Sequence, residues 1–333
     1  MERRHGAYAL RIGLTMTALA ATVAGIVLVG DSWYQLLLAA VLAFVLTQVA
    51  FLGHDAAHRQ IFRSLPANEW AALTLTGLLS GLSYTWWMSK HSRHHGSPNQ
   101  VDKDPDIASK VLVFTKEAGD ARRGLATRLT ARQGTLFIPL LLLEGVNLHV
   151  HGVRELLSRR SSTRRVWVER AFVGIRLLGY VGALFAFLPP GKAAAFLGVQ
   201  VGLFGLFLGG SFAPNHIGMP IVPREAKLDF LHRQVVMSRN VSGGWLTDLV
   251  MGGLNYQIEH HLFPNMPRIN LPAVRPMVRA HCEAHGVPYT EVSFWAAYRQ
   301  LLAYLNRVGV RAADPFRCPL ASQLRGGAGP LAG

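Results

Sequence analysis

Six apolar blocks, each near the length of a membrane span, constrain the fold of this chain more than any other feature. They cover residues 9–30, 33–53, 68–88, 134–150, 170–189 and 193–213. A helix needs about 20 apolar residues to cross the hydrocarbon core of a bilayer. Half of all residues are hydrophobic, and they gather into these blocks instead of following amphipathic patterns. The sequence therefore predicts an all-α integral membrane protein.

Basic residues crowd into the segments between the blocks and predict the orientation of the chain. The formal net charge is +15. Lys and Arg near the ends of spans favour the cytoplasmic side. Arg3, Arg4 and Arg11 therefore place the start of the first block in the cytoplasm, the turn at 30–32 outside, and His54 in the cytoplasm again. Residues 189–192 predict a second external turn. Membrane topology also explains the high positive net charge of the chain better than binding to nucleic acid does.

The basic segments 89–133 and 151–170 should also be cytoplasmic. Blocks 68–88 and 134–150 then begin and end on the same side, and we expect interfacial or re-entrant helices there. This leaves four transmembrane helices in two hairpins, with a cytoplasmic histidine-rich cap and both termini in the cytoplasm. We expect residues 1–320 to form a single membrane domain and residues 321–333, rich in Gly and Pro, to be a disordered tail.

Half of the 14 histidines fall in three short clusters, which are HDAAH from His54, HSRHH from His91 and QIEHH from Gln257. On a helix, residues at i, i+3 and i+4 share one face. The spacing therefore lets His54 with His58, and His91 with His94 and His95, converge on a metal ion. The third cluster repeats the second, with Gln257 in place of the first histidine and with His260 and His261 at its end.

The predicted topology brings all three clusters to the cytoplasmic face, where they can meet. Donors that are mainly imidazole suit iron, zinc, copper or nickel and disfavour magnesium or calcium. The candidate ligands are too many for one ion and suit two ions with open positions. Cys282 and Cys318 form no thiolate metal pattern.

Several neighbours of the clusters are candidates for a supporting role. His216 ends the last apolar block and should face the same site, although a hydrogen-bonded residue at a helix end is an alternative. We expect Asp55, Asn215 and Glu259 to support the ligands, as carboxylates often orient the imidazoles that bind metal. The run from Asn99 to Asp106 predicts a loop that supports the second cluster.

The three clusters closely resemble the histidine boxes of the membrane fatty acid desaturase family. The third box continues as Leu262-Phe263-Pro264, and the resemblance covers roughly residues 35–270. The stretch HHGSPNQVDKDPDI also resembles bacterial desaturases of the acyl-CoA and linoleoyl-CoA type. Gln257 matches the third box of the front-end branch, while many acyl-CoA desaturases have His there.

The resemblance implies two non-haem iron ions with O2 as co-substrate. It assigns the ligand role to His54, His58, His91, His94, His95, His216, His260 and His261. For Gln257 it leaves open direct binding, binding through water, or no role. Zinc is a possible substitute in purified protein, because imidazole sites accept it.

The resemblance also implies the reaction and its partners. The chain would introduce a double bond into a long acyl chain carried as acyl-CoA, with acyl carrier protein and a membrane lipid as the alternative carriers. Arg59, Arg63 and Lys90 are candidate contacts for the phosphates of the headgroup. A cytochrome b5 module with an HPGG motif is not found in these residues, so we expect a separate electron donor, such as a ferredoxin with its reductase. Membrane lipid is expected as a partner and nucleic acid is not.

Other functions fit parts of the same pattern. An acyl or alkane hydroxylase would use the same di-iron site and yield an alcohol. A metal transporter or sensor would line a path with histidines, but no apolar block carries a histidine near its middle. A membrane-anchored structural protein that binds metal would consume no oxygen with acyl substrate and reductant.

Overall fold

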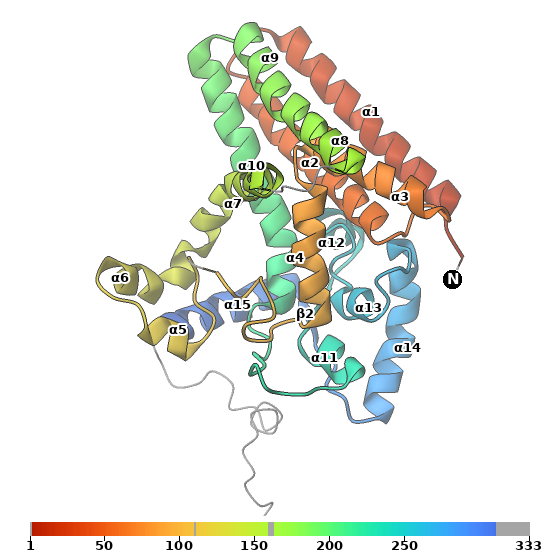
Figure 1. Ribbon diagram of the computed structural model, residues 1–333, viewed down its shortest axis with the longest axis vertical. Helices are drawn as coiled ribbons and strands as arrows, with labels where there is room; N and C mark the ends of the chain where they lie inside the picture. The colour runs from red at the N-terminus through yellow and green to blue at the C-terminus, as the bar shows by residue number, and fades with distance from the viewer. Residues whose placement is uncertain (1, 110, 159–162, 311–333) are drawn as a thin grey trace, which may run out of the picture. The chain divides into compact units, whose positions relative to one another are not determined.

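The computed structural model describes residues 2–109, 111–158 and 163–310, and it is mainly helical (Figure 1). The first half contains α1 (His5–Val29), α2 (Gln35–Ala57), α3 (Leu65–Ala72), a π-helical segment η1 (Leu73–Ser80), α4 (Tyr84–Gly96), α5 (Lys116–Asp120), α6 (Leu125–Ala131) and α7 (Gln133–Ser158). The second half contains α8 (Arg164–Gly174), η2 (Ile175–Gly179), α9 (Tyr180–Phe187), α10 (Pro190–His216), α11 (Phe230–Val236), β1 (Asn240–Ser242), α12 (Trp245–Val250), α13 (Gln257–Leu262), η3 (Arg268–Asn270), α14 (Leu271–Ala284), β2 (Glu291–Ser293) and α15 (Phe294–Gly309). The predicted tail at 321–333 lies outside the described residues.

The chain forms two compact units that alternate along the sequence. The first unit comprises Met1–Ser89, Pro139–Gly210 and Asn265–Asn270, and the second comprises Lys90–Ile138, Ser211–Pro264 and Leu271–Gly333. The first unit holds most of the apolar blocks, and the second holds most of the histidines. The expectation of one domain over residues 1–320 stays a prediction.

Among the residues that the structure describes, five helical stretches are long and apolar enough to cross a membrane. They are His5–Val29, Gln35–Ala57, Gln133–Ser158, Arg164–Phe187 and Pro190–His216. Large apolar side chains such as Leu28 and Leu178 are 86% and 78% exposed, and lipid is the solvent that such faces require. The helical membrane fold is thereby supported. The four-span arrangement stays a prediction, because α7 extends the block at 134–150 to a length that can also span.

Both predicted hairpin turns coincide with breaks between helices. Between α1 and α2, Gly30 adopts φ 58°, and the Gln35 side chain closes the turn by donating from Nε2 to the carbonyls of Ile26 and Gly30 at 2.7 and 2.9 Å. Between α9 and α10, the helix stops at Leu188 and restarts at Pro190, where the missing N–H of proline costs nothing in the first turn. One buried apolar cluster joins residues of α2, α9 and α10, including Leu42, Leu184 and Phe196.

The block at 68–88 is not one helix, which corrects the prediction. α3 runs into η1, which ends at Gly81, and α4 begins only at Tyr84. Gly81 has φ +75°, and a Cβ at this position would lie 3.0 Å from a Leu177 side-chain carbon and 3.2 Å from Arg176. The apolar composition of this block could not predict the break, because the break depends on the close packing of Gly81 against Leu177 and Arg176, which are distant in sequence.

We expect Gly81→Ala to lower the free energy of unfolding by about 1–3 kcal/mol, since left-handed backbone disfavours a side chain and the neighbours crowd it. Thermal unfolding in detergent measures the change. Gly174→Ala is the matched control, because a Cβ there meets nothing within 4 Å, and it should be neutral or slightly stabilising. Equal effects of the two substitutions would contradict the assigned role of Gly81.

The second unit packs short helices around a small parallel sheet. β1 pairs with β2 in the register Val241↔Val292. Behind the sheet, residues of α11, α13 and α14 share a buried cluster that includes Val235, Ile258 and Cys282. α13 is a six-residue helix whose first five residues are all buried, so its histidines are held in the interior of this unit.

Candidate metal centre

The second and third histidine clusters meet in the second unit. On α4, His91 Nε2 lies 3.0 Å from His95 Nε2. On α13, His260 Nε2 lies 3.1 Å from His95 Nε2, and the ring of His261 stacks on that of His95 at 4.3 Å between centroids. Helical spacing on two short elements thus brings four imidazoles into contact.

His216 joins this group from the end of α10. Its Nε2 lies 3.3 Å from His94 Nε2, and its ring centroid lies 4.8 Å from that of His261. His94, His216 and His261 offer one nitrogen each, all within 4.8 Å of one another. The second unit therefore holds two neighbouring imidazole groups, which we call the triad (His94, His216, His261) and the outer group (His91, His95, His260).

The hydrogen bonds of the triad aim its free nitrogens inward. Nδ1 of His94 donates to Asp104 Oδ2 at 2.9 Å, Nδ1 of His216 to the Met237 carbonyl at 3.1 Å, and Nδ1 of His261 to Gln234 Oε1 at 2.9 Å. An oxygen acceptor requires the proton on Nδ1, which leaves Nε2 of each ring unprotonated and able to act as a metal ligand or as a hydrogen-bond acceptor. Nε2 of His261 is buried and has no hydrogen-bond partner.

These distances fit imidazoles that share a metal ion. Two nitrogens bound to one ion at about 2.0–2.1 Å, with an angle of about 90–110° between them, lie about 2.8–3.4 Å apart. The three Nε2 pairs described above fall within this range at 3.0, 3.1 and 3.3 Å. The chain therefore presents a donor set that suits a transition metal.

Burial and neighbouring charges shift the pKa values of two of these imidazoles. Burial, together with the neighbouring imidazoles, lowers the pKa of His261 well below its ordinary value, so this ring is neutral at pH 7. Burial alone would lower the pKa of His94, but the carboxylates of Asp104 and Asp106 outweigh it and raise the pKa. A more basic imidazole is a stronger metal ligand.

The loop after α4 supports the triad, as the sequence predicts. Asp104 is buried, and its Oδ2 accepts from both His94 Nδ1 and the Asn99 backbone N–H, the latter at 2.7 Å. Asn99 in turn donates from Nδ2 to the His216 carbonyl at 3.1 Å. One loop therefore fixes two residues of the triad that lie far apart in sequence.

Gln257 lies at the triad with its amide held in one orientation. Its Nε2 lies 2.9 Å from His216 Nε2, and its Oε1 accepts from Asn215 Nδ2 at 3.2 Å. Asn215 Nδ2 also donates to the Leu254 carbonyl at 3.0 Å. If the amide of Asn215 were flipped, this hydrogen bond would be lost, so Nδ2 of Asn215 faces Gln257 and the oxygen of Gln257 must face Asn215. Gln257 therefore presents its NH2 group to the triad and turns its oxygen, the atom that binds metals, toward Asn215.

Two predicted supporting carboxylates have partners beyond the histidines. Glu259, whose pKa burial raises, accepts from Asn240 Nδ2 and the Tyr289 hydroxyl at 2.7 Å each. Asn240 also accepts the Ile258 N–H at 2.9 Å, so this group joins β1 to α13. In the first unit, Asp55 forms a 2.8 Å ion pair with Arg268 and lies 3.8 Å from His54 Nδ1.

The first cluster lies at the end of α2 in the first unit. The rings of His54 and His58 are 4.6 Å apart, and both contact Trp87. Of the predicted headgroup contacts, Arg59 and Arg63 are exposed residues of the same unit. Lys90, in the second unit, pairs with Asp106 at 2.7 Å.

Three groups that hold the histidines or a supporting carboxylate escaped sequence analysis. Gln234 and the Met237 carbonyl follow no motif, and a backbone acceptor carries no sequence signal. Arg268 follows the third cluster, but nothing in its position points to Asp55. Only Asp104, within the polar run after the second cluster, had a detectable signal.

Comparison with known proteins agrees with this arrangement. The family model described as "Fatty acid desaturase" matches residues 31–293. The chain is 30% identical to an acyl-lipid (9-3)-desaturase of Physcomitrium patens, over 83% of this chain and 54% of that protein. It is 28% identical to a Delta(8)-fatty-acid desaturase of Helianthus annuus, over 89% and 67%, and 31% identical to fatty acid desaturase 3 of Homo sapiens, over 85% and 64%.

The chain thus spans about half to two thirds of the length of these relatives. The matched region contains all three histidine clusters, His216 and the loop that supports the triad. The family model covers more than half of the chain, and the chain therefore belongs to the fatty acid desaturase family.

Proposed function

We propose that this protein is a membrane-bound, oxygen-dependent desaturase that introduces a double bond into a long fatty-acyl chain with two non-haem iron ions. The observation that carries the proposal is the meeting of six imidazoles in the second unit, at Nε2 spacings that suit shared metal ions. Family membership supports desaturation as the reaction of such a site.

In this proposal the triad holds one ion and the outer group contributes to the second. His54 and His58 complete the ligand set on the strength of their sequence spacing. Bound iron would activate O2 as the oxidant, because no ordinary side chain can remove hydrogen from an unactivated methylene group. The chain supplies position: Asp104, Gln234 and the Met237 carbonyl hold the rings of the triad in one tautomer and one direction.

The surroundings proposed for the site follow from the same function. The acyl chain is carried by coenzyme A or by a membrane lipid, and the named relatives include an acyl-lipid enzyme. Electrons come from a separate protein donor, such as a ferredoxin with its reductase. The histidine clusters and both termini lie on the cytoplasmic side of the cell membrane, because Lys- and Arg-rich segments favour that side.

Product analysis tests the proposed function. The chain is expressed in a host with a simple saturated membrane, supplied with iron and a competent ferredoxin system, and fatty acids are compared by gas chromatography with mass spectrometry. We expect new unsaturated species, absent with a His94→Ala, His95→Ala double variant. A hydroxylated product would reassign the site to a hydroxylase, and no new product from iron-loaded protein would refute the proposal.

Gln257 gives a separate prediction about the metal site. Since its NH2 group faces the triad, we expect Gln257→Leu to keep the metal-to-protein ratio of the parent, as measured by plasma mass spectrometry. Product formation should still fall, because a hydrogen-bond donor at the site is lost. Gln257→Asn, which shortens the same amide, is the matched control for metal retention. A lower metal content in Gln257→Leu would instead identify Gln257 as a ligand.

A further inference from the structure

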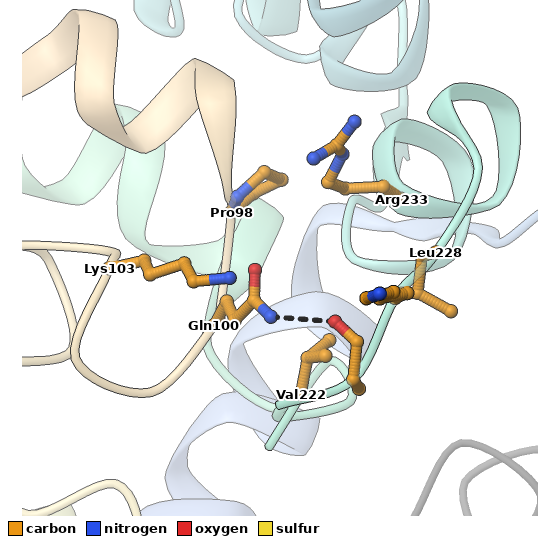
Figure 2. Close-up of a pocket in the computed structure, with 8 residues that line it drawn as sticks. Pro98, Gln100, Lys103, Val222, Leu228 and Arg233 are labelled. Atoms are coloured by element: carbon orange, nitrogen blue, oxygen red, sulfur yellow. Dashed lines mark hydrogen bonds between the residues drawn. The ribbon is translucent and has the colours of Figure 1, made fainter. Parts of the chain in front are cut away.

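A small basic pocket in the second unit has no part in the metal site described above. It has a volume of about 170 Å³ and lies between the loop at 98–103 and the segment at 222–233 (Figure 2). Lys103 and Gln100 come from the first wall, and Lys227, Leu228 and Arg233 come from the second. The two walls are separated by more than a hundred residues in sequence.

The pocket carries three positive charges and no negative one among its lining residues. Within the described part of the chain, Lys103, Lys227 and Arg233 form none of the ion pairs found. Nε of Arg233 is buried without a hydrogen-bond partner. A buried donor that lacks an acceptor is costly, and an anion in the pocket would supply that acceptor.

Hydrogen bonds join the two walls, so the pocket is preformed. The buried Gln100 side chain donates from Nε2 to the carbonyls of Pro223, Arg224 and Ala226 at 3.2, 3.0 and 2.9 Å. Backbone hydrogen bonds run both ways between the walls, from Val101 N to the Val222 carbonyl at 2.9 Å and from Val222 N to the Asn99 carbonyl at 2.8 Å. The spacing of the basic groups is therefore fixed before any ligand arrives.

Size and charge select a single phosphoryl group as the ligand. Pockets for whole drug-sized molecules have about 300–1,000 Å³, so 170 Å³ suits one anionic group of a larger molecule. Three cations exceed what one carboxylate requires. An Arg fork with two Lys ammonium groups matches a doubly charged phosphate.

Both walls continue directly into residues that bind histidines of the metal site. Arg233 precedes Gln234, which accepts from His261 Nδ1 and donates to the His95 carbonyl. The opposite wall includes Asn99 and continues to Asp104, which hold His216 and His94. A ligand in the pocket therefore binds segments that hold the imidazoles of His94 and His261 and the backbone carbonyls of His95 and His216.

We propose that this pocket binds a phosphoryl group of the acyl carrier and so anchors the substrate beside the metal site. This inference rests on the proposed desaturase function, since only an acyl substrate brings such a carrier. Coenzyme A and phospholipids both carry phosphate, and the pocket recognises the chemistry that they share. Lys90, a headgroup contact expected from the sequence, is already paired with Asp106.

Calorimetric titration of the full chain in a phosphate-free maltoside detergent tests the proposal. The probes are coenzyme A with pantetheine as its phosphate-free counterpart, and dihexanoyl phosphatidic acid with dihexanoylglycerol as its counterpart. We expect Lys227→Gln and Arg233→Gln each to weaken binding of at least one phosphorylated probe about tenfold, the value of one charge-assisted hydrogen bond. The probe that responds identifies the carrier.

Arg307→Gln is the matched control, because it removes an exposed positive charge of α15 in the same unit. Unchanged affinity in both pocket variants, or an equal loss with Arg307→Gln, would overturn the proposal. The electron donor is titrated in the same way. If the pocket variants bind the donor more weakly but keep their affinity for both phosphorylated probes, the proposal is overturned and the pocket is assigned to an acidic protein. If phosphate binding depends on the pocket but no olefin forms in the expression host, the proposed function fails while the pocket stands.

Discussion

His261→Ala is expected to lower the metal content of the purified protein by about one ion per chain and to reduce olefin formation more than about 100-fold. His261 is 2% exposed, and its Nε2 is buried without a hydrogen-bond partner. Because Nδ1 is engaged by Gln234, no other atom of the ring is available to bind metal. Loss of the ring therefore removes a donor from the triad that no neighbour can replace.

Two further variants separate the loss of a ligand from the loss of the group that orients it. Gln234→Ala keeps all three nitrogens of the triad but frees the ring of His261, and the loss of such an orienting group typically costs about 10–100-fold in metal affinity or activity. His285→Ala removes an exposed imidazole of the same unit and should change neither quantity. Plasma mass spectrometry and fatty-acid analysis measure both. Full metal content in His261→Ala would show that the triad does not hold an ion.

The sequence predicted the site better than it predicted what holds the site. The clusters on α4 and α13 are local patterns, since residues at i, i+3 and i+4 share a helix face wherever the helix lies. Their meeting was expected from the predicted topology, and the structure places His260 Nε2 3.1 Å from His95 Nε2. The partners of the Nδ1 atoms depend on tertiary approach, so the role of Gln234 was visible only in three dimensions.

The same division applies to the fold. Apolar blocks and Gly or Pro breaks predicted both hairpin turns, because chain composition directly determines where a long apolar helix can stop. The break at Gly81 and the extension of α7 to Ser158 were missed. A left-handed glycine among apolar residues has the same sequence pattern as a glycine inside a helix, and only packing against Leu177 distinguishes the two.

Arg268→Leu is expected to destabilise the protein by about 3–5 kcal/mol, the cost of leaving a buried charge without its partner. Arg268 Nε lies 2.8 Å from Asp55 Oδ2, with side chains 8% and 2% exposed. Arg268 N–H also donates to Gln60 Oε1 at 3.0 Å, and Gln60 accepts from the Tyr8 hydroxyl at 3.1 Å. This network ties η3 to the ends of α1 and α2 within the first unit, beside His54.

Arg165→Leu is the control, because it breaks a pair of similar length, 2.7 Å to Glu69, in the same unit but with Arg165 60% exposed. Exposed pairs contribute about 0–1 kcal/mol. Thermal unfolding in detergent should therefore separate the two variants clearly. The double variant Asp55→Leu, Arg268→Leu should recover much of the loss, since both buried charges are then gone. If Arg268→Leu is no worse than Arg165→Leu, the buried pair does not stabilise this unit, and Asp55 acts on His54 alone.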